Sequence, residues 1–594
     1  MKHSKYSKKR LAVCISAILA TGLSHQLYAQ ETEQLSKKDK ENEIEIIEVT
    51  GIMSSLTRSM ALKRDASGVM DVISAEDMGK FPDTNLAESL QRITGVSVSR
   101  SNGEGSQITV RGFGPDFNLI TLNGRQMPGT GNSRSYSLEN LSSDGVSSLE
   151  VHKTSRAENP SGGLGATVNI VTMKPFQSPG EKLVLSGKGI FDSSNEEGDD
   201  LTPEFSGLYS NTYADDTLGF SIAFSHQERD FQQQAANIQG WQFQSDSQLP
   251  SLDADNIVDN RDANAAAGAF FPRDMNYGIA NIERERTNAN VTFQYAPIDS
   301  LILTLDYTMG QSITGRNSIG WGQWHDYGGN IKAYELDENG TALRFTETAN
   351  DYAHSANVET LLVESESVGF NFEWQITDEF HFELDYHDSD STTDNGADDG
   401  VGHSGNVILA PNNIVTKTYD FSQGGVPQFD ITWPGGAAEA SPGDFDPLFA
   451  QFGRAVGESS VEQLQIDTEW VNPDDSFLTK VKFGLADTAQ TFGGYSANNG
   501  NVGPNGYNGN QAVFPDSMFT RQDTGDFLDA LDGGGSDLTT NYYYLFDYAE
   551  TVARLANFFD SFPVDPFDTD LSSTSSGGVT EETSSIYVQT ALYQ

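Results

Sequence analysis

The feature that most constrains this chain is a two-residue alternation of apolar and polar side chains, repeated in pairs of long segments. One face of the clearest pair carries Val368, Phe370, Phe372, Trp374 and Ile376, then, after a turn at Thr377-Asp378-Glu379, Phe380, Phe382, Leu384 and Tyr386. A period of two indicates a strand with one apolar face, and two such strands joined by a short polar turn indicate a β-hairpin.

The same pattern recurs along the chain. It is found at Val291–Tyr295 with Leu301–Tyr307, and at Leu464–Trp470 with Phe477–Leu485. Apolar faces that end in aromatic residues near the turns are typical of strands in outer-membrane barrels. A soluble β-sandwich also alternates, but its strands and connections are shorter. We therefore predict a mainly β protein, with a transmembrane antiparallel β-barrel over residues 180–594.

The first residues predict export. Basic residues between Lys2 and Arg10 precede an apolar stretch at Leu11–Leu23, and Ala29 offers a small residue for cleavage. We predict a signal peptide over residues 1–29. The apolar stretch is shorter than the roughly 20 residues that a membrane-spanning helix needs. The single cysteine, Cys14, lies within this signal, so we expect neither disulfides nor thiolate chemistry in the exported protein.

The composition limits the partners. Hydrophobic residues make up 37% of the chain, which suits strands that turn half of their side chains toward a polar lumen. The formal net charge is −49, and so many carboxylates repel nucleic acids and other polyanions unless a local basic patch receives them. We expect no nucleic-acid partner, and we expect outer-membrane lipid around the barrel.

A different pattern precedes the barrel and predicts a small α+β domain over residues 60–176. Asn85 can cap a helix that carries Leu86, Leu90 and Ile93 on one face and ends at Gly95. Short strands are expected around it at Val69–Ile73, Val96–Arg100, Gln107–Arg111, Leu119–Leu122, Leu149–Lys153 and Ala166–Val171. A domain of this size can fold as a unit.

Four ordered motifs in this domain resemble the plug domain of TonB-dependent receptors. They are Phe81–Val96, Ile108–Gly114, Leu122–Arg125 and Pro160–Thr172, with the signature positions Arg111, Gly112, Gly114, Asn123, Gly124, Arg125, Gly162, Gly163, Gly165 and Asn169. The resemblance implies an outer-membrane plug-and-barrel transporter. It is most similar to the large subfamily whose members often import plant or algal oligosaccharides.

The chemistry of these positions suits the resemblance. Glycines allow backbone geometries that a side chain forbids, and Arg111 and Arg125 can pair with carboxylates in a bidentate way. In the family such arginines help to hold the plug against acidic residues of the barrel wall. Any one of these residues alone would indicate no more than an ordinary turn.

The segment before the plug predicts a partner. A polar leader over residues 30–44 is followed, over residues 45–51, by a β-prone run whose expected TonB-binding residues are Glu45, Ile46, Ile47, Glu48, Val49 and Thr50. Taken alone, this run could simply be a first strand. Placed ahead of a plug, it resembles a TonB box, which the periplasmic domain of TonB would capture by adding it to a sheet edge.

Long segments without alternation, at 228–285, 310–363 and 389–461, predict extracellular loops. One of them carries the aromatic and polar residues Trp321, Trp324, His325 and Tyr327 on a glycine-rich stretch. We expect these four residues to bind substrate by stacking on sugar rings, although aromatic residues that anchor a strand at the membrane interface are equally common. The aspartates near 388–399 lack the glycine and closing glutamate of a calcium loop, so no metal site is expected.

No motif for catalysis or cofactor binding occurs, so we expect neither an enzyme nor a cofactor. The sequence predicts an outer-membrane active transporter for a scarce ligand, an oligosaccharide ahead of an iron chelate or cobalamin, energised through TonB and its inner-membrane complex. A passive porin or adhesin is the alternative. The chain ends at Gln594 in mid-strand, so we also expect truncation at the C-terminus and an open barrel with unpaired edges.

Overall fold

The computed structural model of the chain divides into residues 1–57 and residues 58–594. It describes residues 60–64, 66, 68–74, 85–129, 133–141, 143, 145–262, 264–348, 351–396, 404–474, 477–498, 514–558 and 575–592. The predicted signal peptide, the leader, the TonB box at 45–51 and the motif residues 81–84 lie outside these ranges. The predicted domain boundaries stay a prediction.

The plug forms a small α+β unit. Its five-stranded sheet has the order β1-β6-β7-β4-β5, with β4 and β7 parallel and the other pairs antiparallel. The elements are β1 (Met70–Ser74), α4 (Leu86–Leu90), β2 (Val96–Ser101), β3 (Glu104–Val110), β4 (Asn118–Leu122), β5 (Arg125–Gln126), β6 (Val146–His152) and β7 (Ala166–Thr172). The predicted helix and six predicted strands are therefore present, with bounds that shift by a few residues.

Local signals explain the plug elements. Asn85 caps α4 by accepting a hydrogen bond from the Glu88 backbone N–H at 3.2 Å, as the sequence predicted. Leu86 and Leu90 of α4 are fully buried. They join one apolar core with the inward side chains of the sheet, among them Leu149, Val168 and Ile170.

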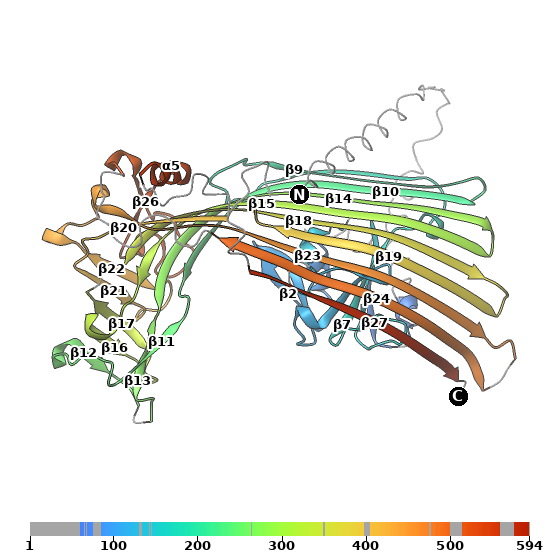
Figure 1. The fold of residues 1–594 in the computed structure, drawn as a ribbon, viewed down its shortest axis with the longest axis horizontal. Coiled ribbons are helices and arrows are strands. Elements are labelled where there is room, and N and C mark those ends of the chain that lie inside the picture. The colour runs from blue at the N-terminus through green and yellow to red at the C-terminus, as the bar shows by residue number, and fades with distance from the viewer. Residues whose placement is uncertain are drawn as a thin grey trace, which may run out of the picture. The chain divides into compact units, whose positions relative to one another are not determined.

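A large antiparallel sheet follows, in the order β27-β24-β23-β19-β18-β15-β14-β10-β9-β8 (Figure 1). Its strands are β8 (Lys182–Ile190), β9 (Thr202–Tyr213), β10 (Leu218–Asn237), β14 (Asp274–Ile298), β15 (Leu301–Trp324), β18 (Tyr352–Gln375), β19 (Phe380–Asp394), β23 (Phe445–Val471), β24 (Leu478–Asn498) and β27 (Ser575–Leu592). A further strand, β20 (Ser404–Pro411), pairs with both β18 and β23.

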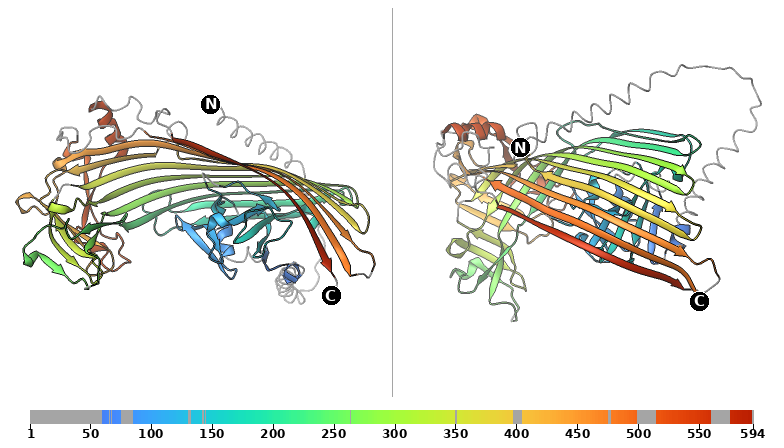
Figure 2. Two further views of the ribbon diagram at one scale, coloured as in Figure 1. Left: turned by 60° about the horizontal axis from the view of Figure 1, so that its bottom comes forward. Right: turned by 45° about the vertical axis from the view of Figure 1, so that its right-hand side comes forward.

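The two faces of this sheet differ as the alternation predicted. On β18, Ser367 and Asn371 are each only 4% exposed, while the intervening Val368 and Phe370 are 48% and 37% exposed. The polar face turns toward the plug, which lies on the concave side of the sheet in Figure 2. An apolar outer face beside a polar inner face is the pattern of a strand that stands in lipid and lines a lumen.

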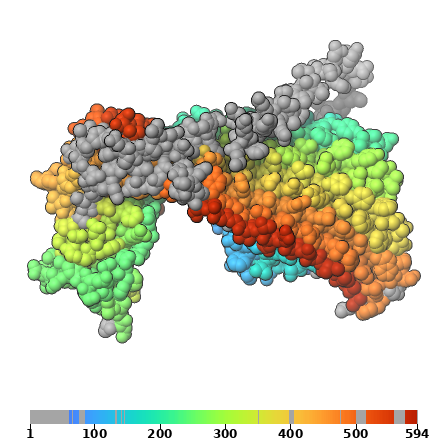
Figure 3. Space-filling view, viewed as in Figure 1, coloured from blue at the N-terminus to red at the C-terminus, as the bar shows by residue number. Residues whose placement is uncertain are grey.

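The sheet is open in the described residues. β8 pairs only with β9, and β27 pairs only with β24, so each has one free edge. Figure 3 shows β27, in red, along one such edge, with part of the plug visible below it. The expected incomplete barrel is therefore confirmed for the described part of the chain. Among those residues no helix is long and apolar enough to cross a membrane.

The two ends of the large sheet differ in their connections. At one end short turns join the strands, such as the turn between Gln375 of β18 and Phe380 of β19. We call this the short-turn end and the opposite end the long-loop end. The predicted turn at 377–379 is confirmed there.

At the long-loop end, the prediction of loops over 228–285, 310–363 and 389–461 was wrong in extent. The barrel strands continue into these segments, and small sheets form between them. The elements of these small sheets are β11 (Trp241–Ser245), β12 (Ile257–Asp259), β13 (Gly268–Pro272), β16 (Ile331–Leu336), β17 (Ala342–Glu347), β21 (Thr416–Asp420) and β22 (Gln428–Thr432). Three further elements, β25 (Thr520–Asp523), β26 (Tyr542–Leu545) and α5 (Tyr548–Phe558), follow later in the chain, outside these segments. Strands whose outer face meets water need no apolar alternation, so the sequence pattern did not reveal them.

Candidate functional site

The junction between the plug and the large sheet contains the most organised polar chemistry, and a tight turn positions it. Asn123 and Gly124, which connect β4 to β5, have φ values of 55° and 88°. Positive φ at both positions is what a two-residue type I′ turn requires, and Asn-Gly is the pair that best tolerates it. Asn169 of β7 holds the turn, because its Oδ1 accepts hydrogen bonds from Gly124 N at 2.8 Å and from Thr121 Oγ1 at 3.0 Å.

The next residue, Arg125, leaves the plug and enters the wall of the large sheet. It donates to both carboxylate oxygens of Asp306 on β15 at 2.8 and 2.7 Å, and to both of Asp385 on β19 at 2.7 and 2.9 Å. Its side chain is 5% exposed. Gly369 of β18 makes room for it, since a Cβ there would lie 1.6 Å from Arg125 Nη1. We call Arg125, Asp306 and Asp385 the Arg125 cluster.

The electrostatics of this cluster favour a permanently charged arginine. Burial by itself lowers the pKa of Arg125, but its hydrogen bonds and attraction to Asp385 and Asp306 outweigh burial and raise that pKa above its ordinary value. One cation thus faces two carboxylates. The pair with Asp385 is bidentate, through Nε and Nη2, whereas Nη1 alone donates to both oxygens of Asp306. The cluster ties the plug to two different strands of the wall.

Arg111 behaves differently from what the resemblance implied. It has a φ of 54°, and its guanidinium donates to the backbone carbonyl of Lys153, which belongs to the plug itself. Its bond therefore braces the plug rather than the wall. Gly112, with a φ of 84°, follows it. Asn118 holds this loop by donating to the carbonyl of Gly114 at 2.9 Å and to that of Phe113 at 3.0 Å.

The remaining signature glycines serve close packing within the plug. Gly162 has a φ of 122°, a conformation that side chains rarely adopt. A Cβ on Gly163 would lie 2.6 Å from Thr167 Oγ1. A Cβ on Gly165 would lie 2.4 Å from Asn118 Oδ1 and 2.6 Å from the Cβ of Phe113. These positions shape the plug.

A second ion-pair cluster, which the sequence analysis missed, joins the plug to strands β10 and β14 of the large sheet. Asn102 and Gly103 form a tight turn with φ values of 50° and 79° between β2 and β3, and Glu104 follows it. Glu104 Oε1 accepts from Arg229 of β10 at 2.7 Å and from Arg284 of β14 at 2.5 Å. Glu104 Oε2 accepts from Arg286 of β14 at 3.3 Å.

The charge of Glu104 is strongly favoured at this place. Burial raises the pKa of Glu104, but the attraction of Arg284 and Arg286, with that of Arg229, outweighs burial and lowers the pKa to about 2. We call these four residues the Glu104 cluster. Its sequence signal was the Asn-Gly turn before Glu104, together with two arginines two residues apart on one strand face. Arg284 fell in the segment 228–285, which we had predicted to be a loop, and Arg286 lies just after it.

The predicted aromatic platform is not open in the structure. Trp321 is 1% exposed and stacks on Tyr543, with ring centroids 4.3 Å apart and an interplanar angle of 10°. Tyr277 and Phe527 pack against it edge-on or tilted, with centroids at 5.7 and 4.9 Å. Trp321 therefore belongs to the apolar core at the long-loop end. A residue buried on this scale cannot offer a free face to a sugar ring without rearrangement of its neighbours.

The other three residues of the predicted set, His325, Tyr327 and Trp324, also contact other residues of the protein. His325 Nδ1 lies 2.8 Å from a carboxylate oxygen of the buried Glu347. The hydroxyl of Tyr327 donates to the backbone carbonyl of Pro272 at 2.9 Å. Trp324 is half-buried, with the guanidinium of Arg273 at 5.3 Å from its ring centre. A role of this set in substrate binding stays a prediction.

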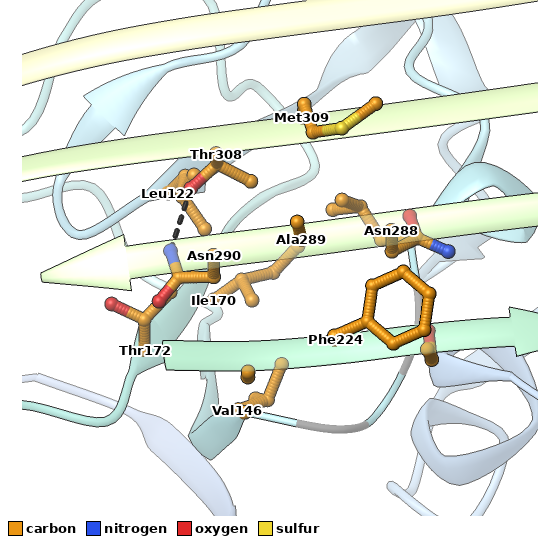
Figure 4. Close-up of a pocket in the computed structure, with 14 residues that line it drawn as sticks. Leu122, Val146, Ile170, Thr172, Phe224, Asn288, Ala289, Asn290, Thr308 and Met309 are labelled. Carbon is orange, nitrogen blue, oxygen red and sulfur yellow. Dashed lines mark hydrogen bonds between the residues drawn. The ribbon is translucent and has the colours of Figure 1, made fainter. Parts of the chain in front are cut away.

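Two cavities lie between the plug and the large sheet. The first, in Figure 4, is apolar and has a volume of about 30 Å³; Leu122, Ile170 and Phe224 line it. A space of that size suits one small solvent molecule and no larger ligand. The second has a volume of about 240 Å³ and opens beside the Arg125 cluster, between Glu383, Asp467 and other carboxylates. No group of His, Cys, Asp or Glu in the described ranges is arranged to hold a metal ion.

Comparison with known proteins identifies the plug. Residues 62–167 match the family model of the TonB-dependent Receptor Plug Domain. This range contains the signature turns and both plug members of the two ion-pair clusters. Residues 62–167 therefore carry a plug domain of the TonB-dependent receptor type.

Two curated relatives give more specific similarities. The chain is 26% identical over 175 residues to the probable TonB-dependent siderophore receptor PirA of Acinetobacter baumannii, covering 27% of this chain and 22% of that protein. It is 28% identical over 190 residues to the ferric enterobactin receptor PirA of Pseudomonas aeruginosa, covering 29% of this chain and 25% of that protein. The chain thus matches about a quarter of the length of these relatives.

Solved structures show more distant likenesses. A mutant of the ferric enterobactin receptor PfeA from Pseudomonas aeruginosa is 12% identical, with a TM-score of 0.28, over 74% of this chain and 70% of that one. The siderophore receptor PirA from Acinetobacter baumannii is also 12% identical, with a TM-score of 0.24, over 75% of this chain and 83% of that one.

Proposed function

We propose that this protein is an outer-membrane receptor that imports a scarce ligand and draws its energy from TonB. The observation that carries the proposal is the Arg125 cluster, in which a plug residue is ion-paired with two strands of the wall. The match to the plug family supports it. On this proposal the plug closes the path until it is moved, and the protein is a transporter rather than an enzyme.

The proposed energy source follows from the strength of this attachment. Moving the plug aside would separate the partners of both clusters, and charges left buried without a partner are strongly unfavourable, so we expect displacement of the plug to need work. The outer membrane holds no nucleotide pool, and the work must therefore arrive mechanically. Residues 45–50 are the proposed handle, captured as an added strand by the periplasmic domain of TonB.

The proposed ligand is an iron chelate of the siderophore class. Its support comes from the two curated relatives, one named a siderophore receptor and the other a ferric enterobactin receptor. An oligosaccharide, the main expectation from the sequence, has less support. The aromatic residue expected to stack on sugar, Trp321, is buried in the core.

An uptake assay tests the energy source and the ligand together. Cells that express the protein are given a radiolabelled ferric catecholate or a labelled neutral oligosaccharide, and accumulation is measured. Deleting residues 45–50 should abolish uptake but leave surface binding within about threefold, or about 0.6 kcal/mol. Deleting the six leader residues 31–36 is the matched control and should leave uptake intact.

Each part of the proposal can fail separately. Accumulation that survives collapse of the proton gradient, or deletion of 45–50, would indicate a passive pore or an adhesin instead. Uptake of the oligosaccharide without uptake of the chelate would overturn the proposed ligand and leave active transport standing.

A further inference from the structure

The wall side of the Glu104 cluster is a concentration of positive charge in a strongly acidic protein. Arg229 of β10 lies directly opposite Arg284 of β14 in the strand register. Arg286 lies two residues further along β14, on the same face as Arg284. Like charges in directly opposed positions destabilise a sheet. This arrangement therefore needs a counter-ion, in a chain whose formal net charge is −49.

Few carboxylates hydrogen-bond to the three arginines, although Glu139 attracts Arg284 and Arg286 and Glu204 attracts Arg286 at longer range. Glu104 is the one carboxylate that hydrogen-bonds to all three guanidinium groups in the described residues. Asp192 adds a bond to Arg229 at 2.8 Å. The other bonds of Arg286 go to neutral groups, namely the side-chain oxygen of Gln227 and the backbone carbonyl of Glu139.

One guanidinium atom points to unused binding capacity. Arg284 is 6% exposed, and its Nε is buried with no hydrogen-bond partner in the described part of the chain. A buried N–H of a charged group without an acceptor is costly. A ligand with several anionic oxygens would satisfy this atom as well as the groups that Glu104 now satisfies.

Glu104 and the arginines belong to different parts of the molecule. Glu104 follows the tip of the β2–β3 hairpin of the plug, whereas Arg229, Arg284 and Arg286 are fixed to wall strands β10 and β14. Any displacement of that hairpin takes away the shared counter-ion, which leaves Arg284 and Arg286 without a hydrogen-bonded carboxylate among the described residues and Arg229 with Asp192 alone. Buried charges without a partner are strongly unfavourable, so another anion that replaced Glu104 would be bound.

We propose that Arg229, Arg284 and Arg286 form an anion-binding site on the barrel wall, which Glu104 occupies while the plug is in place. Its ligand class is a multiply charged anion, such as a metal chelate whose outer oxygens are carboxylates or catecholates. The inference rests on the proposed function in one respect, the displacement of the plug during uptake. The Arg125 cluster has the opposite polarity, because displacement there leaves carboxylates on the wall.

Binding of a fluorescent tetra-anion, pyrene tetrasulfonate, to the full chain folded in detergent micelles tests the site without TonB or uptake. The substitution Glu104→Gln keeps the shape of the side chain and removes its charge. The hairpin of this variant lacks the ion pairs that hold it over the arginines, so the probe can displace it. We expect the variant to bind the probe about tenfold more tightly than the unmodified chain, measured by fluorescence anisotropy. The gain should fall as salt is raised.

Two further variants make the result specific. Glu88→Gln removes one negative charge from the same plug, at an exposed pair with Arg100, and should leave probe affinity unchanged. Adding Arg284→Gln and Arg286→Gln to the Glu104→Gln variant should remove the gain. If Glu104→Gln alone does not fold, Glu104→Gln with Arg286→Gln, compared with Arg286→Gln alone, should still show a smaller gain.

The proposal is overturned if neutralising Glu104 leaves probe affinity unchanged in a folded protein, or if the gain persists without Arg284 and Arg286. Failure of uptake by the unmodified protein would count against the proposed function and would leave this measurement unaffected.

Discussion

Neutralising Arg125 tests whether the plug is held to the wall by the Arg125 cluster. The substitution Arg125→Gln removes the cation that pairs with Asp306 and Asp385, whose side chains are 4% and 16% exposed. Two carboxylates would then face each other without a counter-ion. Removal of one partner from a buried ion pair typically costs about 3–5 kcal/mol, and we expect a loss of stability of this size.

Equilibrium urea unfolding of the full chain in micelles measures the effect, with hydrogen exchange of the amides of β4 and β7 reporting on the plug. Arg100→Gln is the matched control, because the pair of Arg100 with Glu88 is half exposed and should contribute under about 1 kcal/mol. Adding Asp306→Asn and Asp385→Asn to Arg125→Gln should recover much of the loss, since the cluster would then be neutral.

The reasoning is refuted if Arg125→Gln destabilises the plug no more than Arg100→Gln does. The same conclusion follows if the neutral triple variant is as unstable as Arg125→Gln alone, because the loss would then come from packing and not from unpaired charge.

Three further predictions follow from contacts in the structure. Gly369→Ala should loosen the plug in the same exchange experiment, because its Cβ would lie 1.6 Å from Arg125 Nη1. Trp321→Ala should lower the free energy of unfolding by about 3–5 kcal/mol because a large buried side chain is lost. Trp324→Ala should lower it by only about 1 kcal/mol. Equal losses would contradict the core role of Trp321. The stabilisation from the charge of Glu104 should be fully present above its ordinary pKa of 4.5 and should vanish as pH falls toward about 2. Unfolding of the unmodified chain and of Glu104→Gln at a series of pH values would measure it. A difference in unfolding free energy between the two chains that stays constant with pH would contradict the prediction.

Local signals in the sequence were sufficient for the plug elements, for the alternating parts of the barrel strands and for one side of the site. The two-residue alternation fixed which face of β18 is apolar, because side chains of a strand alternate whatever it packs against. Asn85 and the Asn123-Gly124 turn act over a few residues, and the structure shows both as expected. The Asn123-Gly124 turn also defines where Arg125 leaves the plug.

Contacts between residues far apart in the chain could not be predicted in this way. Glu104 meets Arg284 across 180 residues, and nothing local to either residue indicates the other. The burial of Trp321 against Tyr543 was equally hidden, since an aromatic residue on a glycine-rich segment has the same local sequence whether it faces water or a core.

The sequence by itself therefore determined the hairpins, the plug elements and the turn that carries Arg125, because these depend on backbone preferences and on the period of the side chains. Only the tertiary structure decided which wall residues meet the plug, which charges are paired, and that Trp321 is buried. These outcomes depend on the register and curvature of strands distant in the chain, and no short segment of sequence encodes them.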